Sequence, residues 1–204
     1  MAGNGFRAIG KVGQGYAGTI TPFNIFKNYG TSIFYGDPVS LVASGTIERS
    51  DAVAEIDAGD VVGVFAGCEY VDANGDKKFS QHYPASQNVE GIVAYVVGSD
   101  PMTQYKVKWL NGSGVDITVD PDEAIGNCFD IDTTASALAG STFTGNSTMG
   151  LDSTTATPAG GNFRVVALAN DTDGPTAYAE NKEYTHAIVI VNPGLHAFTN
   201  AAGI

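Results

Sequence analysis

The feature that most constrains this fold is a β-hairpin signature near the middle of the chain. An apolar run at residues 59–71 is followed by a polar turn and by a second strand-like run at residues 77–83. The Asn74-Gly75 step in the turn readily takes the positive φ angles of a tight hairpin. Gly63 and Gly67 interrupt the first run, which predicts a bulge or a close approach by other backbone. The rest of the chain is expected to add strands to this hairpin.

Further strands are predicted on both sides of the hairpin. Short β-branched or alternating runs between turn residues are typical of strands, and no stretch keeps the 3.6-residue apolar period of a helix. In residues 105–110, Tyr105, Val107 and Trp109 alternate with lysines at 106 and 108, which predicts one buried and one exposed face. The sequence therefore predicts an all-β protein with a compact β-sandwich or barrel-like body. The other runs that predict strands are 39–42, 46–49, 91–97, 115–119, 125–131, 163–169 and 186–192.

Two segments depart from this pattern. Residues 1–36 are predicted to form an extended N-terminal arm, and residues 37–204 the β domain. Within that domain, residues 133–162 are dominated by Thr, Ser, Ala and Gly, with Asp152 as the one charged residue. Such a composition is typical of a linker, but Phe143, Met149 and Leu151 indicate that this excursion lies against another surface.

The charge is unevenly distributed along the chain. The net charge is −12, from 10 bases and 22 acids. Residues 1–36 contain three bases and no acid (+3), so residues 37–204 contain 7 bases and all 22 acids, giving −15. Binding to nucleic acid depends on neutralising phosphates, so we expect no nucleic-acid partner.

The N-terminal arm is rich in glycine and in aromatic rings. It holds 8 of the 26 glycines and 7 of the 20 aromatic residues, without a regular period. Rings on such a segment can dock into pockets on another surface; alternatively, the segment packs back on its own domain. The first alternative makes six residues candidate anchors to another protein surface. They are Phe6, Tyr16, Phe23, Phe26, Tyr29 and Phe34.

No residue pattern predicts catalysis, a metal site or a cofactor. Asp72, Asn74 and Asp76 resemble the start of a calcium loop, but Lys77 and Tyr83 stand where its glycine and closing carboxylate are required. The three histidines lack metal-ligand spacing, and neighbouring acids such as those at 120–123 are typical of solvated turns. Cys68 and Cys128 are interpreted as buried free thiols, with a disulfide between them as the alternative. We therefore expect a protein that is not an enzyme.

Several phrases of the sequence together resemble a known family. They are Tyr35-Gly36-Asp37-Pro38-Val39, residues 60–70 leading into Phe79-Ser80-Gln81-His82-Tyr83-Pro84-Ala85, residues 144–155, and Phe163-Arg164-Val165-Val166-Ala167-Leu168. The chain from about Tyr35 onward is similar to virion structural proteins of tailed phages, whose members are thought to decorate the head as cement proteins. Extended arms are common among head proteins that clamp neighbouring subunits, so the resemblance favours the docking interpretation of residues 1–36.

The resemblance implies a head decoration protein that binds the outside of the capsid and stabilises it against internal pressure. The expected partners are the major capsid protein and further copies of this chain, as a homo-oligomer with a trimer as the family-like state. The alternative is a glycan- or host-surface-binding β module of the virion, with Tyr70, Tyr83, Tyr105 and Trp109 as stacking rings. The major shell protein itself is disfavoured, because its usual fold needs a long helix.

The expected location is the capsid exterior, after synthesis in the host cytoplasm. The first residues have neither the basic start nor the apolar core of a secretory leader. The apolar runs are far shorter than the ~20 residues that cross a bilayer, so we expect no membrane partner. We also expect that a chain without residues 1–30 folds but no longer binds heads.

Overall fold

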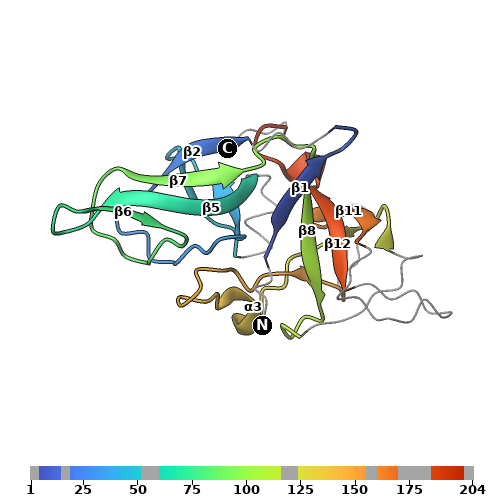
Figure 1. Cartoon of the computed structure of the whole chain (residues 1–204). Helices are drawn as coiled ribbons and strands as arrows, with labels where there is room; N and C mark the ends of the chain where they lie inside the picture. The colour runs from blue at the N-terminus through green and yellow to red at the C-terminus, as the bar shows by residue number, and fades with distance from the viewer. Residues whose placement is uncertain are drawn as a thin grey trace.

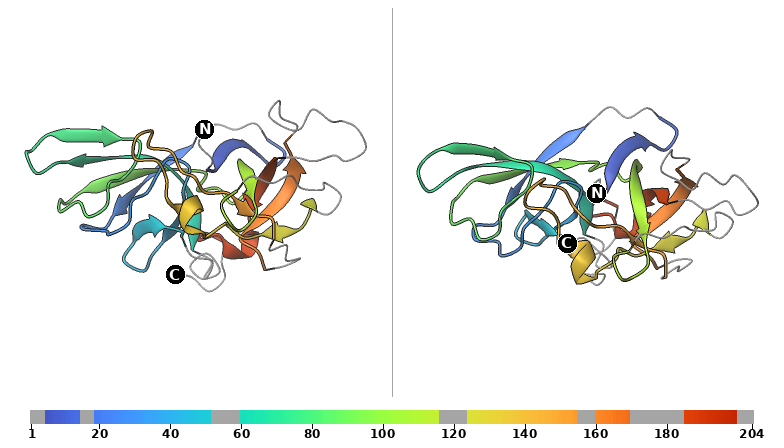
Figure 2. Two further views of the ribbon diagram at one scale, coloured as in Figure 1. Left: turned by 90° about the horizontal axis from the view of Figure 1, so that it is seen from below. Right: turned by 60° about the horizontal axis from the view of Figure 1, so that its bottom comes forward.

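The computed structural model describes residues 5–14, 19–51, 60–115, 124–154, 160–169 and 185–199. Its regular structure is almost entirely β, arranged as two six-stranded sheets that lie side by side (Figures 1 and 2). In chain order the strands are β1 (Arg7–Lys11), β2 (Ile20–Ile25), β3 (Pro38–Leu41), β4 (Thr46–Arg49), β5 (Val61–Val71), β6 (Lys77–Ser80), β7 (Ile92–Val97), β8 (Thr103–Leu110), β9 (Cys128–Phe129), β10 (Leu151–Asp152), β11 (Phe163–Leu168) and β12 (His186–Val191).

One sheet closes on itself. Its order is β3-β4-β2-β7-β5-β6, and β3 also pairs with β5. This extra pairing joins β3, β4, β2, β7 and β5 into a five-stranded barrel and leaves β6 as an outer strand that pairs with β5. The β2–β4 pair is parallel and the other pairs are antiparallel. The all-β, barrel-like body predicted from the sequence is thus confirmed.

The other sheet, the open sheet, has the order β1-β8-β12-β11-β9, with antiparallel neighbours. The short strand β10 pairs with β8 in parallel. The helical segments described in full are the single turn α3 (Ala135–Leu138) and the 3-10 turn η1 (Pro193–Leu195). Within the described ranges, no helix has both the length and the apolar character required to cross a membrane.

The predicted hairpin is β5 and β6, with Glu69 opposite Phe79. In its turn, Gly75 has a φ of +87°, and the Asp72 carboxylate accepts hydrogen bonds from the backbone N–H groups of Asn74 and Asp76. Lys78 lies 3.4 Å from the same carboxylate. The turn oxygens are therefore satisfied by backbone and a lysine, as expected for a polar hairpin turn.

The two glycines of β5 occur where its pairing is irregular. The register with β7 shifts between Phe65 and Gly67, and the pairing with β3 shifts close to Gly63. Gly63 has a φ of +149°, and a Cβ atom there would lie 2.7 Å from the Val97 carbonyl oxygen. A side chain would clash with backbone at this position, so the predicted close approach is confirmed.

Residues 1–36 contribute strands to both sheets. β1 pairs with β8 in the open sheet, and β2 lies between β4 and β7 in the barrel. The described part of the predicted arm therefore takes the other alternative, in which the segment packs back on its own domain. The glycine-rich composition concealed these strands, because neither run shows a sustained alternation of apolar and polar residues.

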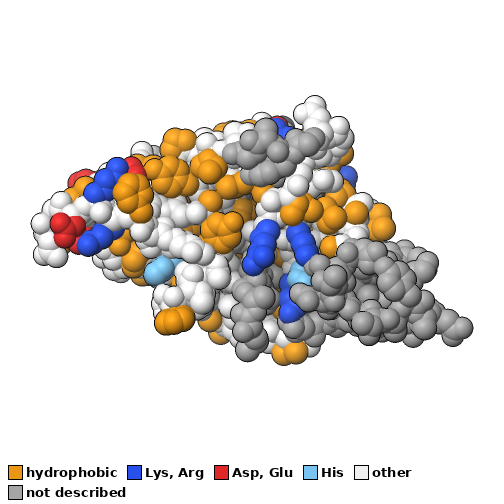
Figure 3. Space-filling model, in the orientation of Figure 1, with side chains coloured by type: hydrophobic (Ala, Val, Ile, Leu, Met, Phe, Trp, Pro, Cys, Tyr) orange, Lys and Arg blue, Asp and Glu red, His pale blue; other side chains and the backbone are white. Residues whose placement is uncertain are grey.

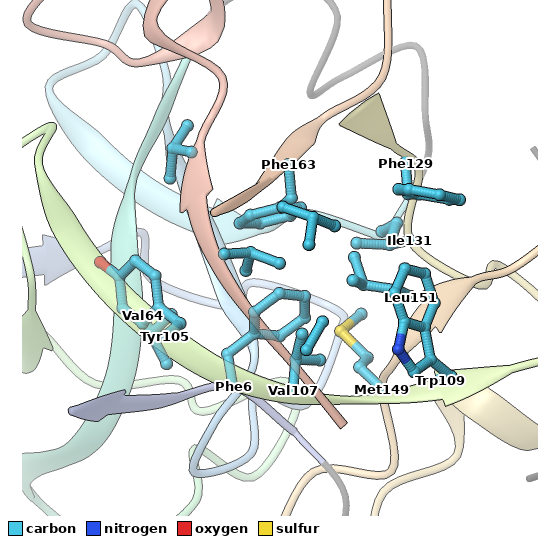
Figure 4. Packing of buried hydrophobic residues seen from close by; sticks show 14 of the residues in the cluster. Phe6, Val64, Tyr105, Val107, Trp109, Phe129, Ile131, Met149, Leu151 and Phe163 are labelled. Atoms are coloured by element: carbon cyan, nitrogen blue, oxygen red, sulfur yellow. The ribbon is translucent and has the colours of Figure 1, made fainter. Parts of the chain in front are cut away.

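Each sheet covers its own core. The open-sheet core holds the inward rings of β8 together with Phe6, directly before β1, and residues of β5 and β11, and Figure 4 shows these side chains converging. The barrel interior holds the second core. The main members of the open-sheet core are Phe6, Val61, Val64, Tyr105, Val107, Trp109, Phe129, Ile131, Met149, Leu151, Phe163 and Val165. Those of the barrel core are Ile25, Ile33, Val39, Ile47, Val62, Phe65, Cys68, Tyr83, Ile92, Ala94 and Val96.

The excursion at residues 133–162 contains α3 and β10. Met149 and Leu151 are buried in the open-sheet core, as the sequence predicts. Phe143 does not follow that expectation, because its side chain is 98% exposed. The ring lies in a turn that points away from both cores, so the apolar character of this residue is not explained by packing within the chain.

Candidate interaction surface

Phe6 is a core residue and not a surface anchor. Its side chain is 1% exposed, and its ring lies 4.5 Å from the Phe163 ring and 6.5 Å, edge-on, from the Tyr105 ring (Figure 4). Its backbone N–H donates to the Gly36 carbonyl at 2.8 Å. These contacts seat the start of β1 between the two sheets, so docking this ring elsewhere would open the core.

Phe34 is also buried, in the loop between β2 and β3. Its ring stacks on His82, with centroids 5.6 Å apart and planes 13° from parallel. Gly140, with a φ of +60°, lies directly against the ring, where any Cβ atom would collide with it. The absence of a side chain at Gly140 therefore creates the place that Phe34 fills.

The other arm rings differ in exposure. Phe23 and Tyr29 are partly buried against the barrel core, and Tyr29 lies 6.1 Å from Tyr83. Phe26 is 60% exposed, just after β2. Tyr16 lies outside the described residues. Of the six candidate anchors, the structure thus corrects Phe6 and Phe34, which are buried in their own chain, and leaves Phe26 on the surface.

A buried polar junction holds the Phe34 loop in place. The Asp37 carboxylate is 1% exposed and accepts a hydrogen bond from the Phe34 N–H at 2.8 Å. Burial raises the pKa of Asp37 from 3.8 to about 6, while hydrogen bonds from Ser147 and Phe34 and the nearby Arg49 guanidinium oppose the rise. Arg49 in turn pairs with Asp51 at 2.9 Å. The junction ties β3 and β4 to the excursion.

A second buried titratable group lies where the two sheets meet. His196, after η1, bridges to Val61 at the start of β5, and the Ala197 N–H donates to the Val61 carbonyl. Burial lowers the pKa of His196 from 6.5 to about 4, and the Asp100 carboxylate opposes this shift. The imidazole is therefore neutral near pH 7. The two buried groups serve the fold and have no exposed reactive face.

The outer face of the barrel carries an apolar surface across four strands. Pairing places Pro22 of β2 beside Tyr95 of β7, and Glu69 of β5 between Val93 and Phe79. Figure 3 shows hydrophobic side chains gathered over β2, β7 and β5. We name this surface the apolar barrel face. Its members are Ile20, Pro22, Val71, Phe79, Val93, Tyr95 and Val97, all exposed or half-buried.

Phe79 is the most exposed ring on the apolar barrel face, at 72%. The Lys77 ammonium lies 5.0 Å from its centroid and 3.1 Å from the Glu69 carboxylate. This contact with Lys77 lowers the pKa of Glu69. A contiguous exposed apolar patch marks an interaction surface, and because Lys77 and Glu69 pair with each other, a partner can bury the Phe79 ring without leaving either charge unpaired.

The outer face of the open sheet is basic. Arg7 lies opposite Lys106, and Lys108 opposite His186, in strands β1, β8 and β12, which contain no acid. Figure 3 shows blue side chains gathered over β1 and β8. Local positive charge thus coexists with the net charge of −12. The expectation that nucleic acid is not a partner was based on that net charge and stays a prediction.

The residues weighed for chemistry lie apart. Cys68 is a buried free thiol in the barrel and Cys128 one in the open sheet. Burial raises the pKa of Cys68 to about 12, so it is protonated and unreactive at neutral pH. Within the described ranges, no three residues among His, Cys, Asp and Glu come together as a metal site.

The rings of the glycan alternative are mostly inside the protein. Tyr83, Tyr105 and Trp109 are all fully buried, whereas Tyr70 is partly exposed. A stacking platform requires neighbouring exposed rings, so these residues cannot form one. Phe79, Phe143 and Phe198 are exposed rings that the sequence did not predict as binding residues. Their exposure has no local sequence signal, because it depends on what the rest of the chain leaves uncovered.

No family model, no curated protein and no solved structure matches this chain.

Proposed function

We propose that this chain is a phage head decoration protein, which binds the outside of the capsid through exposed apolar side chains. The observation that carries the proposal is the apolar barrel face, where Phe79 of the outer strand β6 is 72% exposed and β6 pairs with β5 of the closed barrel. A rigid face of this kind binds a protein partner without a large ordering cost. The resemblance to virion proteins supplies the identity of the partner, the major capsid protein.

In this proposal the protein acts by binding to the capsid shell and catalyses no reaction. Each fully buried Phe or Val side chain contributes roughly 1.5–3 kcal/mol, so a few contacts suffice for one weak bond between decoration protein and shell. Many such bonds on a closed shell act together, because each bound copy is held close to its neighbours. Contacts that bridge adjacent shell subunits would in this way oppose the outward pressure of packaged DNA. The net charge of −12 keeps unbound copies soluble.

The first test is the location of the protein. We expect mass spectrometry of purified virions of the encoding phage to detect the chain at a copy number near that of the shell protein. Imaging of the same particles at subunit resolution should show it on the outer surface. Absence from virions, or a position inside the head, would contradict the proposal.

The second test addresses the surface. Phe79→Ser should reduce binding to undecorated heads by roughly tenfold or more, because burial of the ring is lost. Phe198→Ser is the matched control, since Phe198 is 56% exposed but is not part of the apolar barrel face. Phe26→Ser tests the arm residue that remains on the surface. Equal binding by wild type and Phe79→Ser would remove the apolar barrel face from the proposal.

A further inference from the structure

The turn that contains Phe143 is a braced loop. We name residues 141–148 the Phe143 loop. The Ser141 N–H donates to the Asn146 carbonyl at 2.9 Å, and the Gly145 N–H donates back to the Ser141 carbonyl at 2.6 Å. Gly145 has a φ of +73°, the left-handed conformation that such a reversal needs. The loop is therefore closed by its own backbone.

The base of the Phe143 loop is clamped to two other segments. The Tyr35 N–H donates to the Gly145 carbonyl, and the Ser147 N–H donates to the Tyr35 carbonyl, both at 2.9 Å. The Gln81 side chain, just beyond β6, donates to the Asn146 Oδ1 atom at 2.8 Å. The loop is thus attached to the Phe34 loop and to the end of β6. Its position is defined before any partner binds.

The tip of the loop carries an apolar ring that packs against no core of its own chain. Thr142, Phe143 and Thr144 are all exposed, and Phe143 is 98% exposed. Tyr35, which the loop clamps, is itself 38% exposed and adds a second ring beside the base. An isolated exposed ring on a rigid support has the properties of a binding hot spot, because its burial adds affinity and little conformational entropy is lost.

The charge of the surrounding chain indicates what kind of partner fits. Residues 133–151 contain no charged side chain, in a protein whose net charge is −12. An uncharged tip enters an uncharged apolar pocket without desolvating an ion. Two copies of this chain repel each other through their net charge, which favours a different protein as the partner.

We infer that the Phe143 loop is a preformed plug whose ring inserts into an uncharged apolar pocket of the capsid shell protein. The inference rests on the proposed decoration function and assigns it a second contact beside the apolar barrel face. The ring supplies the buried area, the threonines form an uncharged rim, and the clamp to Tyr35 and Gln81 keeps the plug in place.

The test compares loop variants on undecorated heads of the encoding phage, by co-sedimentation and by occupancy in subunit-resolution images. Phe143→Ser should weaken binding roughly tenfold or more, whereas Phe143→Leu should retain most of it because an apolar side chain still fills the pocket. Thr142→Asp should weaken binding as well, since it brings a charge to the rim. Ala43→Asp, in the exposed turn between β3 and β4, is the control with the same change in net charge.

The outcomes are distinguishable. The four variants change three positions, all of them exposed, so we expect unchanged melting temperatures for every variant. If the wild-type protein binds heads and Phe143→Ser binds them equally well, the plug is overturned and the decoration function is not. Wild type that does not bind heads at all would overturn both. A fall in the solution mass of the protein on Phe143→Ser would identify a second copy as the partner and also overturn the inference.

Discussion

Two buried side chains, Asp37 and His196, make stability depend on pH in opposite directions. The folded-state pKa of Asp37 is raised to about 6, so its contribution to stability is present in full below pH 3.8 and is lost as the pH rises through about 6. The folded-state pKa of His196 is lowered to about 4, so stability falls as the pH drops from 6.5 towards 4. Between pH 4 and 6 the two contributions to the free energy of unfolding change in opposite directions. The wild-type free energy of unfolding therefore shows neither contribution clearly when it is plotted against pH.

Asp37→Asn should separate them. Asparagine cannot ionise, so the variant keeps the contribution of His196 and loses that of Asp37. We expect the difference in unfolding free energy, wild type minus variant, to fall by up to about 3 kcal/mol between pH 4 and pH 7.5. Urea unfolding at several pH values measures this difference. The corresponding control is Glu90→Gln, because the Glu90 side chain is 79% exposed. A difference that is constant with pH would show that Asp37 has no raised pKa.

At the scale of elements, the position of β2 changes the expected result of an N-terminal truncation. β2 lies between β4 and β7, and the closed barrel cannot form without it. Phe6, directly before β1, is part of the open-sheet core. The sequence led us to expect a folded body without residues 1–30, whereas the structure leads us to expect the reverse.

We therefore predict that the chain without residues 1–30 loses its cooperative unfolding transition. Removing β2 exposes the barrel core along two strand edges and leaves unpaired those backbone groups of β4 and β7 that face β2. Thermal unfolding followed by circular dichroism checks this. If the truncated chain is soluble and unfolds cooperatively, this prediction is wrong and residues 1–30 are an arm that the fold does not need.

A matched pair of point variants refines the same comparison. Phe6→Ala should destabilise the protein by about 3–5 kcal/mol, since it leaves a cavity between Phe163 and Tyr105. Phe26→Ala removes the same ring from an exposed position and should change stability by about 0.5 kcal/mol or less. Similar effects at the two positions would contradict the placement of Phe6 in the core.

At the scale of the whole molecule, net charge governs association. We retain a homo-oligomer, with a trimer as the family-like state, as a proposal. Each copy carries −12, and the Debye length shortens from about 30 Å at 0.01 M salt to about 8 Å at 0.15 M, so added salt should favour self-association. Light scattering coupled to size-exclusion chromatography measures the mass against the 21.1 kDa chain. A monomer mass at every salt and protein concentration would exclude a stable oligomer.

The sequence by itself determined the fold class and the strands with a strong local pattern. The hairpin of β5 and β6 follows from an Asn-Gly turn, and the two faces of β8 follow from alternation, because turn chemistry and strand periodicity act over a few residues. The same local signal located β4 at Thr46–Arg49. The buried thiols were also predicted, since each lies in an apolar strand.

Only the tertiary structure decided which aromatic rings are core and which are surface. Phe6 is buried because β8 and β11 cover it, while Phe143 is exposed because a loop clamped by Tyr35 and Gln81 holds it away from both cores. Closure of the barrel likewise depends on β3 meeting β5. Each of these environments is made by segments far apart in the chain, and a glycine-rich or threonine-rich stretch carries no local pattern that specifies its distant neighbours.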